Sequence, residues 1–166
     1  LDELGIHPSG KILEWFERLG KGVDHQHTTL DDIQEVLDGN DGSMDGGYLC
    51  SYPVFLGIYR MIERMLERGG QSVYLMLCTV IDSKGNPMRD GPMLDELTNR
   101  MGDAVRLSIR RGDAMTKYGK GQYLVLLVNT TRENCRVIQN RINQRFIIGR
   151  QRTGIKYYVN SVFWTP

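Results

Sequence analysis

The sequence lacks both a long apolar run and an excess of charge of either sign. No hydrophobic stretch in its 166 residues approaches the ~20 residues that a transmembrane helix requires, so we expect no membrane contact. The 21 basic and 20 acidic residues leave a formal net charge of +1. The chain as a whole therefore makes no electrostatic case for binding nucleic acid.

Cysteine is also scarce. Cys50, Cys78 and Cys135 are far apart, no CxxC pair exists, and an odd count argues against a disulfide framework. We expect reduced, mostly buried thiols in a cytoplasmic protein. The chain begins with Leu1 and no signal-like segment follows, which favours a fragment of a longer protein.

The residues that are present have an ordinary composition, with 40% hydrophobic and 25% charged residues. Such values are typical of a soluble globular protein and argue against disorder. The length allows one compact domain with a real core, together with an appendage.

Residues 109–128 predict the end of a helix, a short strand, a tight turn and a second strand. Gly119 and Gly121 flank Lys120 at the turn, and glycine supplies the positive φ that a primed hairpin turn needs. The run 124–128, Leu-Val-Leu-Leu-Val, has no polar alternation, which predicts a strand buried on both faces.

From residue 73 onward the pattern is βαββαβ, the ferredoxin-like arrangement of an α/β (α+β) domain. A first strand over 72–81 precedes a helix over 92–110, and a helix over 131–146 precedes a last strand over 155–163. Thr130 and Glu133 have the spacing of a capping box for the second of these helices. We expect at least four strands, antiparallel pairing across the turn, and both helices on one face of the sheet.

Another helix is predicted over 50–68, with Pro53 in its first turn. Its apolar positions define a wide face, and we interpret the methionines on it as core residues rather than a binding surface. The positions are Val54, Phe55, Ile58, Met61, Ile62, Met65 and Leu66.

Before this domain, residues 1–20 predict an amphipathic helix and residues 21–47 a linker with a short helix at 30–37. The first helix carries Trp15 and Phe16, so we expect it to be buried against the following domain or a second copy. His25 and His27 have no further His or Cys ligand nearby and make a poor metal site.

The hairpin also carries a family resemblance. Arg110-x-x-Asp113 followed by Lys117-Tyr118-Gly119-Lys120-Gly121-Gln122-Tyr123 resembles the signature of the GGDEF domain, the fold of bacterial diguanylate cyclases. Gly119 matches the first glycine of the signature and Tyr123 its aromatic residue. Lys120, Gly121 and Gln122 stand where the second glycine and both acidic residues would be. The resemblance covers 48–163, and we assign 48–166 to a degenerate GGDEF-like domain.

The resemblance implies a metal site that this sequence does not retain. Family members join two GTP molecules with two metal ions, held by carboxylates from the first strand and from the hairpin. Aligning Lys84 on the family's lysine places Thr79 and Ile81 where two aspartates would be, and Asp82 is one residue off, on the opposite face of a strand. Neutral side chains cannot balance Mg²⁺ charge as a carboxylate does. We therefore expect no metal, no cofactor, no catalytic residue and no enzyme activity.

A second family feature is an inhibitory site that binds cyclic di-GMP through Arg-x-x-Asp, which Arg110 and Asp113 match. Guanidinium groups suit both phosphate and the guanine edge. The alternative is that Arg110 and Arg111 form the solvated end of a helix while Asp113 caps the turn.

The stretch Glu3-Leu4-Gly5-Ile6-His7-Pro8-Ser9 is similar to the C-terminal end of the bacterial transcriptional activator domain, which is usually preceded by a DNA-binding domain. The order of segments also resembles clostridial activators that carry a Gln-Tyr hairpin. Together these resemblances imply a non-catalytic GGDEF-like regulatory domain of a transcription regulator. It would act by ligand sensing or as a homo-oligomer, and would contact DNA only through a missing N-terminal domain. A cyclic di-GMP receptor and an active diguanylate cyclase are the alternatives.

Overall fold

The computed structural model describes residues 29–39, 45–69, 72–147 and 152–163. The chain divides into two compact units, 1–44 and 45–166. In the first unit, helix α2 spans Leu30–Gly39, within the segment predicted to be a linker. The predicted helix with Trp15 and Phe16, and the pair His25 and His27, lie outside the described residues. None of the described helices is long and apolar enough to cross a membrane.

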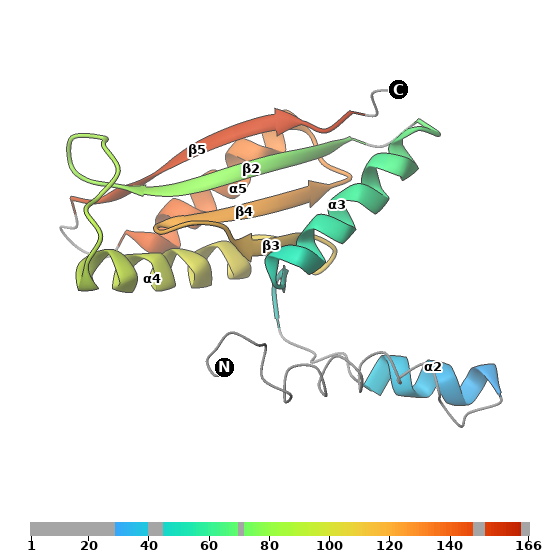
Figure 1. Cartoon of the computed structure of the whole chain (residues 1–166). Helices are drawn as coiled ribbons and strands as arrows, with labels where there is room; N and C mark the ends of the chain where they lie inside the picture. Colours follow the sequence, from blue (N-terminus) through green and yellow to red (C-terminus); the bar gives the residue numbers. More distant parts are fainter. Residues whose placement is uncertain (1–28, 40–44, 70–71, 148–151, 164–166) are drawn as a thin grey trace, which may run out of the picture. The chain divides into compact units, whose positions relative to one another are not determined.

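The second unit is built on a five-stranded sheet in the order β1-β3-β4-β2-β5 (Figure 1). The last four strands in the sequence pair antiparallel in the βαββαβ arrangement, which confirms the predicted fold. The short β1 adds to one edge, parallel to β3. The strands are β1 Tyr48–Leu49, β2 Val73–Ile81, β3 Ala114–Lys117, β4 Gln122–Val128 and β5 Gly154–Ser161.

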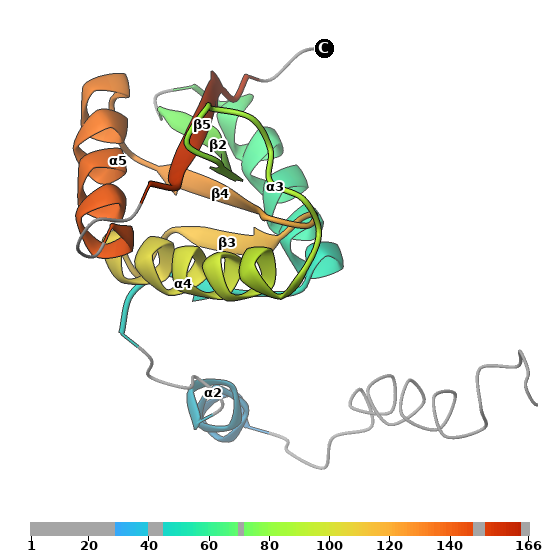
Figure 2. The same ribbon diagram turned by 90° about the vertical axis from the view of Figure 1, so that its left-hand side faces the viewer.

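Helices cover both faces of this sheet (Figure 2). Helices α4 (Pro92–Ser108) and α5 (Arg132–Phe146) pack on one face, as predicted. Helix α3 (Tyr52–Leu66) packs on the other. The larger core lies under α4 and α5, and its fully buried side chains include Met76, Met101, Val125, Leu127 and Ile142.

The central strand β4 is buried on both faces, as its unbroken apolar run predicts. Val125 and Leu127 belong to the core under α4 and α5, whereas Leu126 belongs to the core under α3. All three side chains have no exposed surface. Alternation along a strand therefore places apolar residues into two separate cores.

The cysteines follow their prediction. Cys78 and Cys135 are buried, Cys50 is half-buried, and all three are free thiols. Burial raises the pKa of each thiol, so none has the low pKa of a reactive cysteine.

The start of α5 differs from its prediction by one residue. The N-cap is Thr131, whose Oγ1 accepts a hydrogen bond from the Asn134 backbone N–H at 3.0 Å. Thr130 is buried instead, and its Oγ1 accepts from the Asn134 side-chain amide at 2.7 Å. The predicted Thr130 capping box is therefore wrong. The chain leaves β4 through Asn129 with φ of 50°, and this turn delays the helix start.

Helix α3 corrects a second prediction. Phe55 is buried, and Ile58, Ile62 and Leu66 pack against the sheet. Met61 and Met65 instead remain 57% and 49% exposed. The apolar face predicted for this helix is wider than the stripe that the sheet can cover, so the two methionines are not core residues.

Candidate functional site

The site begins with the hairpin between β3 and β4. The Tyr118 N–H donates to the Gln122 carbonyl at 3.1 Å, and the Gln122 N–H donates to the Gly119 carbonyl at 3.0 Å. Gly121 has φ of +70°, whereas Lys120 does not have a positive φ. A positive φ at the second central residue alone is the pattern of a type II turn, so the expected primed turn is wrong although the hairpin is confirmed.

Gly121 is required here for two reasons. Its backbone conformation disfavours any residue with a Cβ atom. A Cβ at this position would also lie 3.0 Å from Leu94 Cδ1 on α4. The hairpin turn therefore packs closely against the first helical turn of α4.

At the base of this turn, Thr79 of β2 and Gln122 of β4 are partners in the strand register. The Gln122 Nε2 donates a hydrogen bond to Thr79 Oγ1 at 3.3 Å. These are two of the positions that the family resemblance assigns to metal-binding carboxylates. The fold brings them together, and both side chains are neutral.

The other two positions offer no replacement charge. Ile81 closes the end of β2, where it pairs with Gly154 and bridges to Pro87, and Gly121 has no side chain. Across the described residues, no group of three or more His, Cys, Asp or Glu side chains could hold a metal ion.

The nearest carboxylate in sequence, Asp82, shapes the loop after β2. Its Oδ1 accepts from the backbone N–H groups of Lys84 at 2.9 Å and Asn86 at 3.0 Å. The hydrogen bond from Asn86 is the main reason that the pKa of this exposed carboxyl lies below its usual range. The Asp82 side chain therefore stabilises a turn, as the turn-forming sequence Asp-Ser-Lys-Gly leads us to expect.

Lys120, at the tip of the turn, pairs with Asp90 in the loop before α4. The hydrogen bond lowers the pKa of Asp90 and raises that of Lys120. Both side chains are exposed, so the pair contributes little to stability. It does link the turn to the loop that joins β2 and α4. Sequence reasoning missed this pair, because no spacing signal connects residues 30 positions apart.

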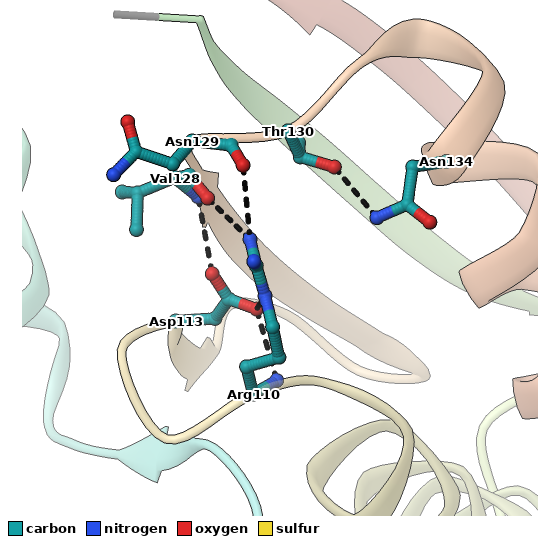
Figure 3. A network of polar contacts seen from close by, with 6 residues as sticks. All are labelled: Arg110, Asp113, Val128, Asn129, Thr130 and Asn134. Atoms are coloured by element: carbon teal, nitrogen blue, oxygen red, sulfur yellow. Dashed lines mark hydrogen bonds and ion pairs between the residues drawn. The ribbon is translucent and has the colours of Figure 1, made fainter.

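Arg110 and Asp113 come together between α4 and β3 (Figure 3). The Asp113 side chain is fully buried, and its Oδ2 lies 3.6 Å from Arg110 Nε. Oδ2 accepts from the Arg110 backbone N–H at 2.9 Å, and Oδ1 accepts from the Val128 N–H at 3.0 Å. The carboxylate therefore joins the start of β3 to the end of β4.

The Arg110 guanidinium reaches the same strand end. Its Nη2 donates to the Val128 carbonyl and, at 3.4 Å, to the Asn129 carbonyl. About half of the side chain, 53%, remains exposed. Both oxygens of Asp113 thus accept hydrogen bonds inside the protein, whereas part of the Arg110 side chain is accessible to solvent. The predicted ligand role of this pair stays a prediction.

Comparisons with known proteins place the fold. No family model and no curated protein sequence matches the chain. Among solved structures, it is similar to the diguanylate cyclase SiaD of Pseudomonas aeruginosa, solved in complex with its activator SiaC, with 17% identity and a TM-score of 0.53. The match covers 92% of this chain and 61% of that one. The chain has the GGDEF fold.

Two further structures support the same fold. A diguanylate cyclase protein of Thermotoga maritima has 13% identity and a TM-score of 0.53, over 72% of this chain and 86% of that one. The GGDEF domain of DgcB from Caulobacter crescentus, solved with c-di-GMP, has 14% identity and a TM-score of 0.52, over 74% and 77%. At such identities the likeness concerns the fold and carries no assignment of activity.

Proposed function

We propose that this chain is a non-catalytic GGDEF-like regulatory domain of a bacterial transcription regulator, which acts by ligand sensing or self-association. The observation that carries the non-catalytic part is the neutral pair formed by Thr79 and Gln122. The fold brings the two positions into contact, so their chemistry can be judged from the residues themselves.

Condensation of nucleoside triphosphates needs divalent cations that neutralise phosphate charge and activate a hydroxyl group. Mg²⁺ is held by hard, anionic oxygen ligands, usually one or two carboxylates together with phosphates and water. A threonine hydroxyl and a glutamine amide, hydrogen-bonded to each other, supply no negative charge. Asp82 is one residue off the matching position, and its Oδ1 already accepts two backbone N–H groups in the loop after β2.

The experiment is a turnover assay of the purified chain with GTP and either Mg²⁺ or Mn²⁺, with an active diguanylate cyclase as the positive control. We expect no cyclic di-GMP above a boiled-protein blank. Calorimetric titration of Mn²⁺ should likewise give no heat with the wild type, and binding should appear in the double variant Thr79→Asp/Gln122→Glu. Product formation by the wild type would refute the proposal.

The ligand-sensing part has its best candidate in Arg110, because its guanidinium is half exposed beside a carboxylate. A nucleotide phosphate could approach that face, but the buried Asp113 already accepts two backbone hydrogen bonds. We therefore expect cyclic di-GMP to bind weakly or not at all in calorimetry. Tight binding that Arg110→Ala abolishes would instead favour the receptor alternative.

The transcription-regulator part rests on the resemblance of residues 1–20 to the end of a transcriptional activator domain. A DNA-retention assay can test it, by comparing the natural full-length product with this chain. We expect only the full-length product to be retained on promoter DNA. Equal retention of both would contradict the assignment of DNA contact to a preceding domain.

A further inference from the structure

A groove of about 440 Å³ opens at the C-terminal end of α3. It is lined by Met61, Arg64, Met65, Arg68 and Gly69. The two methionines lie one helical turn apart and keep about half of their surface exposed. Flexible, polarisable methionine side chains are common on surfaces that receive an apolar partner.

The charge at this groove is positive. Arg64 and Arg68, also one turn apart, form no ion pair with any residue that the structure describes. Glu63 is half-buried, Glu67 is exposed, and neither lines the groove. Burial, followed by the Glu63 carboxylate, raises the pKa of Tyr59. Two free guanidinium groups beside an apolar floor favour a partner that is both acidic and apolar.

Helix α2 has that chemistry. Between Leu30 and Gly39 it carries four acidic residues and no basic one. Leu30, Ile33 and Leu37 follow the spacing i, i+3, i+7 and are 69%, 36% and 67% exposed. No residue of α2 is buried. A helix of this length is marginal alone in water, so its apolar stripe needs a surface.

We propose that the α3 groove of one copy receives the acidic amphipathic helix α2 of a second copy of this chain. The arrangement is a helix-in-groove contact, in which anchors at i, i+3 and i+7 enter an apolar groove. When the exchange is reciprocal, with each helix in the groove of the other copy, the result is a two-fold dimer. This proposal deepens the self-association part of the proposed function and rests on it.

The two surfaces share the spacing of their apolar residues and are opposite in charge. Helix α2 is about 15 Å long, and Ile33 and Leu37 have the one-turn spacing of Met61 and Met65. Asp31 and Asp38 are seven residues apart and therefore lie on the same side of α2, next to its apolar stripe. They are placed to meet two arginines that flank a methionine floor.

The test is sedimentation equilibrium of the 166-residue chain over a range of concentrations. We expect the wild type to dimerise. Both Arg64→Glu/Arg68→Glu and Asp31→Lys/Asp38→Lys should weaken the dimer roughly tenfold or more. Their combination should restore dimerisation, because opposite charges again face each other. A matched control, Arg141→Glu/Arg145→Glu on the exposed side of α5, should leave it unchanged.

A wild type that stays monomeric would overturn the proposal, as would a groove variant that dimerises like the control or a combined variant that does not recover. Thermal melting of each variant checks that the exposed substitutions leave the fold intact. The turnover and Mn²⁺ assays depend on Thr79 and Gln122 rather than on this groove. The docking proposal can therefore fail while the non-catalytic assignment stands. Equally, the non-catalytic assignment can fail while the docking proposal stands.

Discussion

The buried carboxylate of Asp113 gives the sharpest test of how this domain is held together. Replacing it with asparagine keeps the shape but turns one acceptor oxygen into an N–H₂ donor. Of the two backbone donors that Asp113 satisfies, those of Arg110 at 2.9 Å and Val128 at 3.0 Å, one would then face another donor. A lost hydrogen bond to a charged group and an unpaired buried N–H each cost about 1–3 kcal/mol.

We therefore expect Asp113→Asn to lower the free energy of unfolding by about 2–3 kcal/mol. Asp113→Ala leaves both donors unpaired and should cost roughly 3–5 kcal/mol. Urea denaturation followed by circular dichroism measures both values, and 2 kcal/mol corresponds to a fall in Tm of roughly 6–10 °C for a domain of this size. The matched control is Asp103→Asn on the exposed side of α4, which should change stability by less than about 0.5 kcal/mol. Equal stability of Asp113→Asn and this control would refute the structural role of Asp113.

Two glycines give further predictions. Gly102→Ala should destabilise the protein by about 1–3 kcal/mol, because the added Cβ would lie 2.6 Å from the Tyr123 hydroxyl. Its control is Gly57→Ala on α3, where the added Cβ meets nothing within 4 Å. This control should stabilise the protein by up to about 1 kcal/mol. Gly121→Ala should lower the free energy of unfolding by about 1–3 kcal/mol, because Gly121 has a φ of +70°. Its control is Gly112→Ala, where the added Cβ enters open space at a residue without a positive φ. This control should leave the stability almost unchanged. Thermal melting of the four variants checks both pairs, and a Gly102→Ala or Gly121→Ala variant as stable as its control would contradict the packing described for that glycine.

The fold was predictable because its signals are local and strong. The apolar run Leu124–Val128, the glycines at 119 and 121 and the periodic helices leave few arrangements of the sheet open. The helix boundaries were less predictable: Thr130 and Thr131 are both good caps, and only the path of the chain through Asn129 decides between them. Likewise, the apolar pattern of α3 does not tell how much of it the sheet will cover.

The sequence predicted which residues belong to the candidate site but not the contacts that these residues make. Aligning Lys84 placed Thr79 at one carboxylate position, and the signature turn placed Gln122 at another. Only the strand register shows that the two residues are partners. The hydrogen bonds of Asp113 could not be derived, because Val128 is 15 residues away in sequence and meets it only once the hairpin has formed. The glycine at 102 inside a helical pattern was the one available signal of close packing, and its partner is the aromatic residue of the signature turn.

The contact between Gly102 and Tyr123 is one of several that give this hairpin a structural role in the domain. Gly121 gives the turn its positive φ and lets it approach Leu94. Gln122 joins the two central strands through Thr79, and the ring of Tyr123 lies against Gly102 of α4, with the side chain 7% exposed. Each of these contacts stabilises the sheet or its packing on α4, and none of them requires a metal ion or a nucleotide. These contacts give the turn a structural role in the fold, so its presence alone is no argument for catalysis.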